Sequence, residues 1–146
     1  MQMSSTLEST ELSGRGGGGG GATAAGPYQQ AIELTFGAGV NEITGTVTVP
    51  AGLLLVIETV TADVGVANNE QPFVFVSTVV RGVTAQHTIA LQELPRSPNV
   101  FGATHDVRLY ADAGTTVTIM VTRFGASPYP AIPKPELVTI SGRLEH

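Results

Sequence analysis

The chain has 146 residues, which is the length of a single domain. Charged residues make up only 13% of it, about half of the roughly 25% found in an average soluble domain. The net charge is −5, and Lys134 is the one lysine, so the sequence supplies no basic stripe to neutralise nucleic-acid phosphates. The absence of cysteine excludes disulfides, thiolate metal sites and cysteine nucleophiles.

The first 27 residues have the composition of an arm or linker rather than of a packed segment. A stretch rich in Ser, Thr and Glu runs into six glycines at 16–21, and such a composition buries too little surface to offset its ordering entropy. The glycines are not followed by Lys-Ser or Lys-Thr, so they do not form a phosphate-binding loop. The expected organisation is an arm at 1–27, a β-sandwich domain at 28–143 and a tag remnant at 144–146.

From residue 31 onwards, polar and apolar residues alternate with a period of two, β-branched residues are frequent and turn-forming residues recur. This pattern predicts an all-β body, because successive side chains of a strand point to opposite faces. In chain order, strands are expected at residues 31–36, 43–49, 53–61, 73–80, 83–91, 107–111, 115–123 and 136–144.

Short turns separate most of these strands, among them Arg81-Gly82 in a predicted hairpin, while residues 93–102 and 128–135 contain several prolines and are expected to be loops. The connections are too short for crossover helices. The sequence therefore predicts an antiparallel two-sheet β-sandwich, with an eight-stranded jelly roll as first choice. An immunoglobulin-like sandwich is second, because the sequence lacks its cysteine pair and its tryptophan.

Three segments resemble a group of small bacterial β-sandwich proteins of jelly-roll type: VPAGLLLVIE at 49–58, VRLYADAGTTVT at 107–118 and VTISG at 138–142. They are turn and strand framework, so the resemblance implies the fold and transfers no functional residue. Export signals are common in that group. We find no such signal in the first thirty residues and no apolar run of the length of a membrane helix, about 20 residues.

The sequence predicts no catalytic, cofactor-binding or metal site. It has no Gly-X-Ser-X-Gly nucleophile elbow. His87 lies at an inward position of its expected strand, which favours a core or interface histidine. His105 and Asp106 are adjacent in a strand and therefore point to opposite faces, which disfavours joint chelation of a metal ion. A calcium ion between loops stays open, although no calcium-binding loop motif occurs. We expect a protein that is not an enzyme.

Apolar residues occupy consecutive positions in two expected strands, at 53–57 and at 73–76. Such runs present apolar side chains to both faces of a sheet, and one sandwich buries only one of those faces. Either a loop covers the outer side chains or they form a subunit interface, which low charge favours. The candidate interface residues are Leu54, Val56, Phe73 and Phe75.

The leading hypothesis is a non-enzymatic structural subunit that assembles with itself through these faces and its N-terminal arm. Analogy with other jelly rolls suggests a trimer, in a virion, a phage particle or a cell-surface assembly. The alternative is a carbohydrate-binding module that binds a surface glycan through Tyr110 and Arg108, since sugar sites use exposed aromatic rings. Neither hypothesis involves nucleic acid, membrane insertion or a cofactor.

Overall fold

The computed structural model describes residues 24–146, and the predicted two-sheet antiparallel sandwich is confirmed. The strands are β1 (Gly26–Leu34), β2 (Glu42–Thr48), β3 (Leu54–Gly65), β4 (Gln71–Val80), β5 (Val83–Ile89), β6 (Gln92–Glu93), β7 (Val100–Ala111), β8 (Thr116–Phe124) and β9 (Glu136–Glu145). No helix occurs within residues 24–146.

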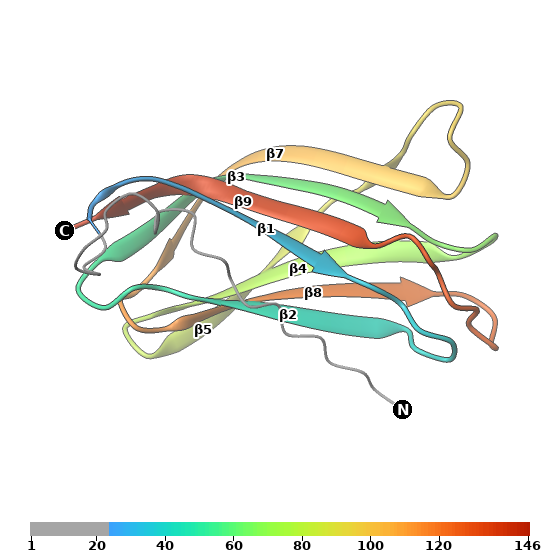
Figure 1. Ribbon diagram of the computed structural model, residues 1–146, viewed down its shortest axis with the longest axis horizontal. Helices are drawn as coiled ribbons and strands as arrows, with labels where there is room; N and C mark the ends of the chain where they lie inside the picture. Colours follow the sequence, from blue (N-terminus) through green and yellow to red (C-terminus); the bar gives the residue numbers. More distant parts are fainter. Residues whose placement is uncertain (1–23) are drawn as a thin grey trace.

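The strands form two layers that lie one above the other (Figure 1). One sheet has the order β1-β9-β3-β7-β6 and the other the order β2-β8-β4-β5, and every paired strand is antiparallel. Chain neighbours β1 and β2, and likewise β3 and β4, therefore lie in different sheets. The hairpins β4–β5 and β6–β7 are the exceptions, because the two strands of each belong to the same sheet.

The period of two in the sequence accounts for the core between the layers. In β8, Val117, Ile119 and Val121 are fully buried, while the alternate residues lie on the outer face. The facing strands contribute in the same way, and burial of these side chains is the main stabilising term of such a sandwich. The fully buried apolar core includes Phe36, Ile43, Leu55, Ile57, Val60, Val64, Val74, Val76, Val138 and Ile140.

Two expected boundaries are corrected by the structure. Residues 93–102 are not one continuous loop, because Gln92 and Glu93 pair with Gly102 and Phe101, and β7 already begins at Val100. The prolines concealed this pairing, and the connection between β6 and β7 consists of the six residues 94–99. The strands also number nine rather than eight among the described residues, the additional one being the two-residue β6.

The ends of the sandwich domain pair with each other. Gly26 pairs with Leu144, so β1 begins two residues before the expected domain start and β9 continues to Glu145. Leu144 also pairs with Leu55 and is buried in the core. Most of the expected arm, residues 1–23, lies outside the described residues.

The inner side of β5 differs from expectation. Its alternation predicts that Val83, Ala85 and His87 face a core, yet Val83 is 66% exposed, Ala85 is exposed and His87 is half-buried. The cause is the position of the strand. β5 ends its sheet, and in the other layer β7 is followed only by the two-residue β6, so little covers this side.

Candidate functional surface

The outer face of the β2-β8-β4-β5 sheet carries a cluster of exposed aromatic rings. Phe73 and Phe75 on β4 stack with ring centroids 6.4 Å apart, and Phe124 on β8 meets Phe73 edge-on at 5.5 Å. Phe73 is 36% and Phe124 51% exposed. Met120, which pairs with Phe75, completes a patch that we call the aromatic face: Phe73, Phe75, Met120 and Phe124.

The rest of this sheet face is polar but almost uncharged. Its strand residues are mostly threonine, and Glu42 at the start of β2 is the one ionisable side chain among its outward strand positions. Solvated faces of antiparallel sheets carry polar residues on alternate positions, as the threonines do here, and their edge strands usually carry charges as well. Exposed aromatic rings on a face with few charges are typical of a surface that contacts another molecule.

The four candidate interface residues do not lie together. Phe73 and Phe75 belong to the aromatic face, whereas Leu54 and Val56 are on the outer side of the other sheet. Val56 is fully buried there, flanked by its cross-strand partners Tyr110 and Arg143. Neighbours within the same sheet therefore cover Val56. Of the large apolar side chains that are exposed within residues 24–146, Phe73 and Phe124 are the two that lie in contact with each other, on the aromatic face.

The residues of the glycan hypothesis are neighbours on the outer side of β7. Tyr110 and Arg108 are two positions apart, so they share this face, and Tyr110 is 41% exposed. Beside Tyr110 lies a half-exposed ionic group in which the Arg143 guanidinium donates to Glu58 and, at 2.5 Å, to Glu145. These contacts raise the pKa of Arg143, chiefly through its hydrogen bond to Glu145.

An open pocket of about 580 Å³ lies elsewhere on the same sheet, beside β3, β6 and β7. It is lined mainly by small and polar residues, among them Asp63, Glu93 and Thr104. It contains no aromatic side chain, and it does not include Tyr110 or Arg108. The Tyr110 ring and the Arg108 guanidinium, which the glycan hypothesis requires, therefore lie on an open sheet face outside this pocket.

The two candidate histidines lie near the β5 edge without forming a metal site. The Nε2 atom of His105 is 3.0 Å from the Ala90 carbonyl oxygen, while its neighbour Asp106 points to the outer face. His87 pairs with Val76 on β4. Within residues 24–146, no group of three or more His, Asp or Glu side chains is placed to hold a metal ion.

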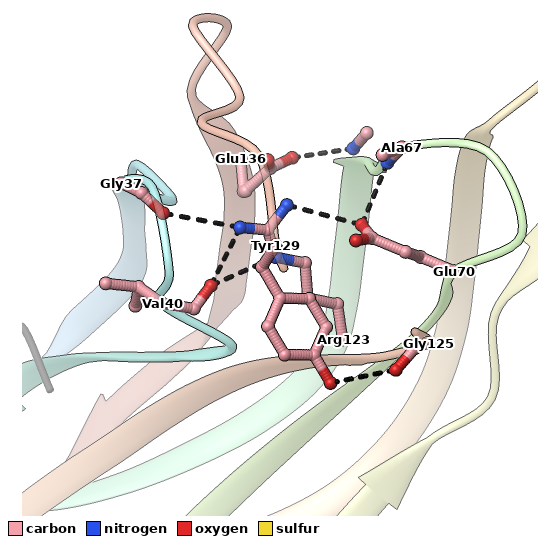
Figure 2. A network of polar contacts seen from close by, with 9 residues as sticks. Gly37, Val40, Ala67, Glu70, Arg123, Gly125, Tyr129 and Glu136 are labelled. Carbon is pink, nitrogen blue, oxygen red and sulfur yellow. Dashed lines mark hydrogen bonds and ion pairs between the residues drawn. The ribbon is translucent and has the colours of Figure 1, made fainter. Parts of the chain in front are cut away.

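At the end of the sandwich where β1–β2, β3–β4 and β8–β9 are joined, the structure reveals a buried polar network that the sequence analysis missed. Figure 2 shows the guanidinium of Arg123, which is fully buried, between the β1–β2 loop and Glu70. It donates to the carbonyl oxygens of Val40 (2.8 and 3.0 Å) and Gly37 (3.3 Å), and to Glu70 Oε1 at 3.2 Å. Glu70 Oε1 also accepts from the Ala67 N–H.

Aromatic rings complete the surroundings of this guanidinium. Its central carbon lies 4.5 Å from the ring centroid of Phe36 and 5.2 Å from that of Tyr129 in the proline-containing loop. Such rings attract a cation through their quadrupole, most strongly where water is excluded. Arg123 therefore joins three loops at one end of the sandwich. A signal was available in the sequence: Arg123 shares the inward parity of Val117, Ile119 and Val121.

Glu136, at the start of β9, is a second buried acid in this region. Its Oε1 accepts from the Gly65 N–H at 2.6 Å, while its Oε2 has no hydrogen-bond partner among the described residues. Burial, reinforced by the nearby Asp63, raises the pKa of Glu136 from 4.5 to about 7, against the opposing effects of the Gly65 N–H, Arg123 and Lys134. The side chain is thus a proton-binding group near neutral pH.

This raised pKa predicts a pH-dependent stability. The folded protein binds the Glu136 proton more tightly than the unfolded chain does, so the stabilisation is present at pH 4.5 and below and is lost as the pH rises through 7. Between pH 5 and pH 8 we expect a loss of about 2–3 kcal/mol from this group. Urea unfolding across this range measures it. Glu136→Gln keeps the acceptor for Gly65 and should flatten the profile; an unchanged slope in that variant would contradict the assignment.

Comparisons with protein-family models, with curated proteins and with solved structures found no match to this chain. No helix that could span a membrane is present in the described part of the chain. The class defined by the fold and the surface is therefore a two-layered antiparallel β-sandwich, stabilised at one end by a buried arginine and exposing an aromatic, nearly uncharged sheet face.

Proposed function

We propose that this protein is a non-enzymatic structural subunit that associates with copies of itself through the aromatic face. The observation that carries the proposal is the cluster of Phe73, Phe75 and Phe124 on β4 and β8, the two inner strands of a sheet whose outer face is almost uncharged. Contact between copies would remove these aromatic rings from water. This burial is favourable by about 25 cal/mol per Å² of apolar surface. Charged residues, whose desolvation opposes association, are scarce on this face.

The strand order supports a jelly-roll subunit. Apart from β6, the eight strands form two four-stranded sheets in the orders β1-β9-β3-β7 and β2-β8-β4-β5. In this order the first strand, β1, lies beside the last, β9. Apart from the hairpin β4–β5, each of the eight strands is followed along the chain by a strand of the other layer, as in a folded-over double Greek key. Assembly as a trimer, and placement in a virion or cell-surface structure, rest on analogy between jelly rolls. The role of residues 1–27 as an assembly arm remains a prediction.

The native mass in solution tests this function. We expect an oligomer for the full chain in size-exclusion chromatography with light scattering. Phe73→Ser and Phe124→Ser should weaken association at least tenfold each, because both remove half-exposed rings from the contact while leaving the core intact. Tyr110→Ser, which removes an exposed ring from the opposite sheet, is the matched control and should leave the mass unchanged. A monomer at every accessible concentration would refute the proposal.

Carbohydrate binding is the second candidate, supported by the exposed ring of Tyr110 beside Arg108 on one sheet face. The ring offers a stacking surface and the guanidinium offers hydrogen-bond donors, the two elements that a sugar site needs. On this reading, Tyr110→Ala abolishes retention on a glycan array, and Phe73→Ser does not. Equal retention by all three proteins, or none by the native chain, would exclude this site.

A further inference from the structure

The free edge of β5 carries a second feature that bears on association. Four strands end the two sheets: β1, β6, β2 and β5. β1 contains Pro27 and Glu33, β6 has only two residues, and β2 contains Glu42. Proline, charge and short length each hinder the pairing of an edge strand with another chain. β5, with the sequence VTAQHTI, has no proline, aspartate, glutamate, lysine or arginine in its seven residues.

The hairpin geometry fixes which backbone groups face outward. Arg81 and Gly82 both have positive φ, at 54° and 77°, which is the two-residue turn whose flanking pair, Val80 and Val83, is hydrogen-bonded. Hydrogen-bonded and non-hydrogen-bonded pairs alternate in an antiparallel ladder. Thr84, Gln86 and Thr88 therefore form non-hydrogen-bonded pairs with β4. The N–H and C=O groups of these three residues point away from β4.

A contact on β4 agrees with this assignment. The carbonyl of Val79, the partner of Thr84, accepts from the Asp112 N–H at 3.0 Å, on the side of β4 opposite to β5. Within residues 24–146, no strand pairs with the outer side of β5. Three residues of this edge thus present backbone donors and acceptors to whatever approaches.

The β5 sequence is complementary to itself about a two-fold axis at Gln86. In an antiparallel pair centred there, Gln86 faces Gln86 of a second copy, Thr84 faces Thr88, and Val83 faces Ile89. The backbone groups of Thr84, Gln86 and Thr88 point outward, so three pairs of these residues form (Thr84–Thr88, Gln86–Gln86 and Thr88–Thr84), with about two hydrogen bonds each. Threonine pairs and β-branched apolar pairs are favourable cross-strand neighbours, and no like charges meet.

We propose that β5 pairs with β5 of a second copy, joining the two four-stranded sheets into one continuous sheet. The inference rests on the proposed self-association and names one of its contacts. Val83, which is 66% exposed in the single chain, would pack beside Ile89 of the second copy. The pairing also brings the two aromatic faces onto one side of the joined sheet, because Phe75 is the cross-strand neighbour of Thr88.

The test measures dimer dissociation by light scattering over a dilution series. Gln86→Pro removes an outward N–H and no bond to β4, and we expect it to weaken the dimer at least tenfold. Thr84→Lys should do the same by placing a charge at the pair with Thr88. Thr104→Lys is the matched control, because it replaces an exposed threonine of the opposite sheet, and it should not weaken the dimer. Circular dichroism verifies that each variant retains its sheets.

Hydrogen exchange provides a second readout that a change in fold would not mimic. The amides of Thr84, Gln86 and Thr88 should exchange slowly in concentrated protein and rapidly after dilution. Protection that does not change on dilution would overturn the proposal, because the edge would then be covered by the same chain. If Phe73→Ser dissociates the oligomer and Gln86→Pro does not, the edge contact is refuted while the proposed function stands; a native monomer refutes both.

Discussion

Replacement of Arg123 by methionine is expected to lower the free energy of unfolding by about 4 kcal/mol. The change leaves the Glu70 carboxylate, whose side chain is only 3% exposed, without its cationic partner, and it leaves the Val40 and Gly37 carbonyls without their side-chain donor. Removing one member of a buried ion pair costs about 3–5 kcal/mol because an uncompensated charge remains in a region of low dielectric constant. For a domain of this size the melting temperature should fall on the order of 10–15 °C.

Urea unfolding and calorimetry of the variant measure this effect, and Arg108→Met, at an exposed position of β7, provides the matched control with an expected change below about 0.5 kcal/mol. The double variant Arg123→Met with Glu70→Gln separates charge from packing. The amide still accepts from Ala67 but is neutral, so the double variant should be more stable than the single one. If the double variant is less stable than Arg123→Met, the buried charge is not the cause.

Substitution of Gly142 by alanine is expected to destabilise the sandwich by about 3 kcal/mol or more. Gly142 pairs with Ile57 where the register of β3 shifts between Ile57 and Thr59. A Cβ atom on Gly142 would lie well inside van der Waals contact of the Val56 carbonyl oxygen and 3.0 Å from the Glu58 nitrogen. Both neighbours are backbone atoms of a central strand, so the clash is relieved only by displacement of the β3–β9 ladder.

Thermal unfolding of Gly142→Ala measures the cost, and Gly65→Ala is the control. Gly65 is also in a strand without positive φ, but a Cβ atom there would meet only the Glu136 carboxylate, at an ordinary 3.9 Å. We expect that variant to change stability by less than about 1 kcal/mol. Equal effects of the two substitutions would show that loss of glycine in a strand, rather than the close approach at the β3 bulge, is responsible.

The end of β8 shows how this chain distributes its polar and apolar side chains. Thr122, Arg123 and Phe124 are consecutive, and the strand directs the arginine into the interior and the phenylalanine to the outer face. A solvated sheet shows the reverse arrangement. The buried arginine is stable because loops supply carbonyls, a carboxylate and two rings; the exposed phenylalanine extends the aromatic face. This inversion is consistent with a surface that is covered by another molecule.

Local patterns in the amino-acid sequence were sufficient to predict the all-β class, most strand positions and the short turns. Period-two alternation and turn residues are local signals, and backbone sterics convert them directly into strands and hairpins. The sequence also marked Phe73 and Phe75 as candidates, because a run of apolar residues on both faces is visible without knowledge of the partner strands. Val56 showed the same pattern but is fully buried.

Which of these side chains are covered depends on the packing of strands that are far apart in the sequence. Whether Val56 is exposed depends on Tyr110 and Arg143 in strands distant in sequence, and the β3–β9 and β3–β7 registers are not encoded locally. The same holds for Arg123: its parity pointed inward, but its partners come from three loops that meet only when the two sheets pack. Pairing across long sequence separations creates these surroundings, so they exist in the folded chain and not in any one segment of it.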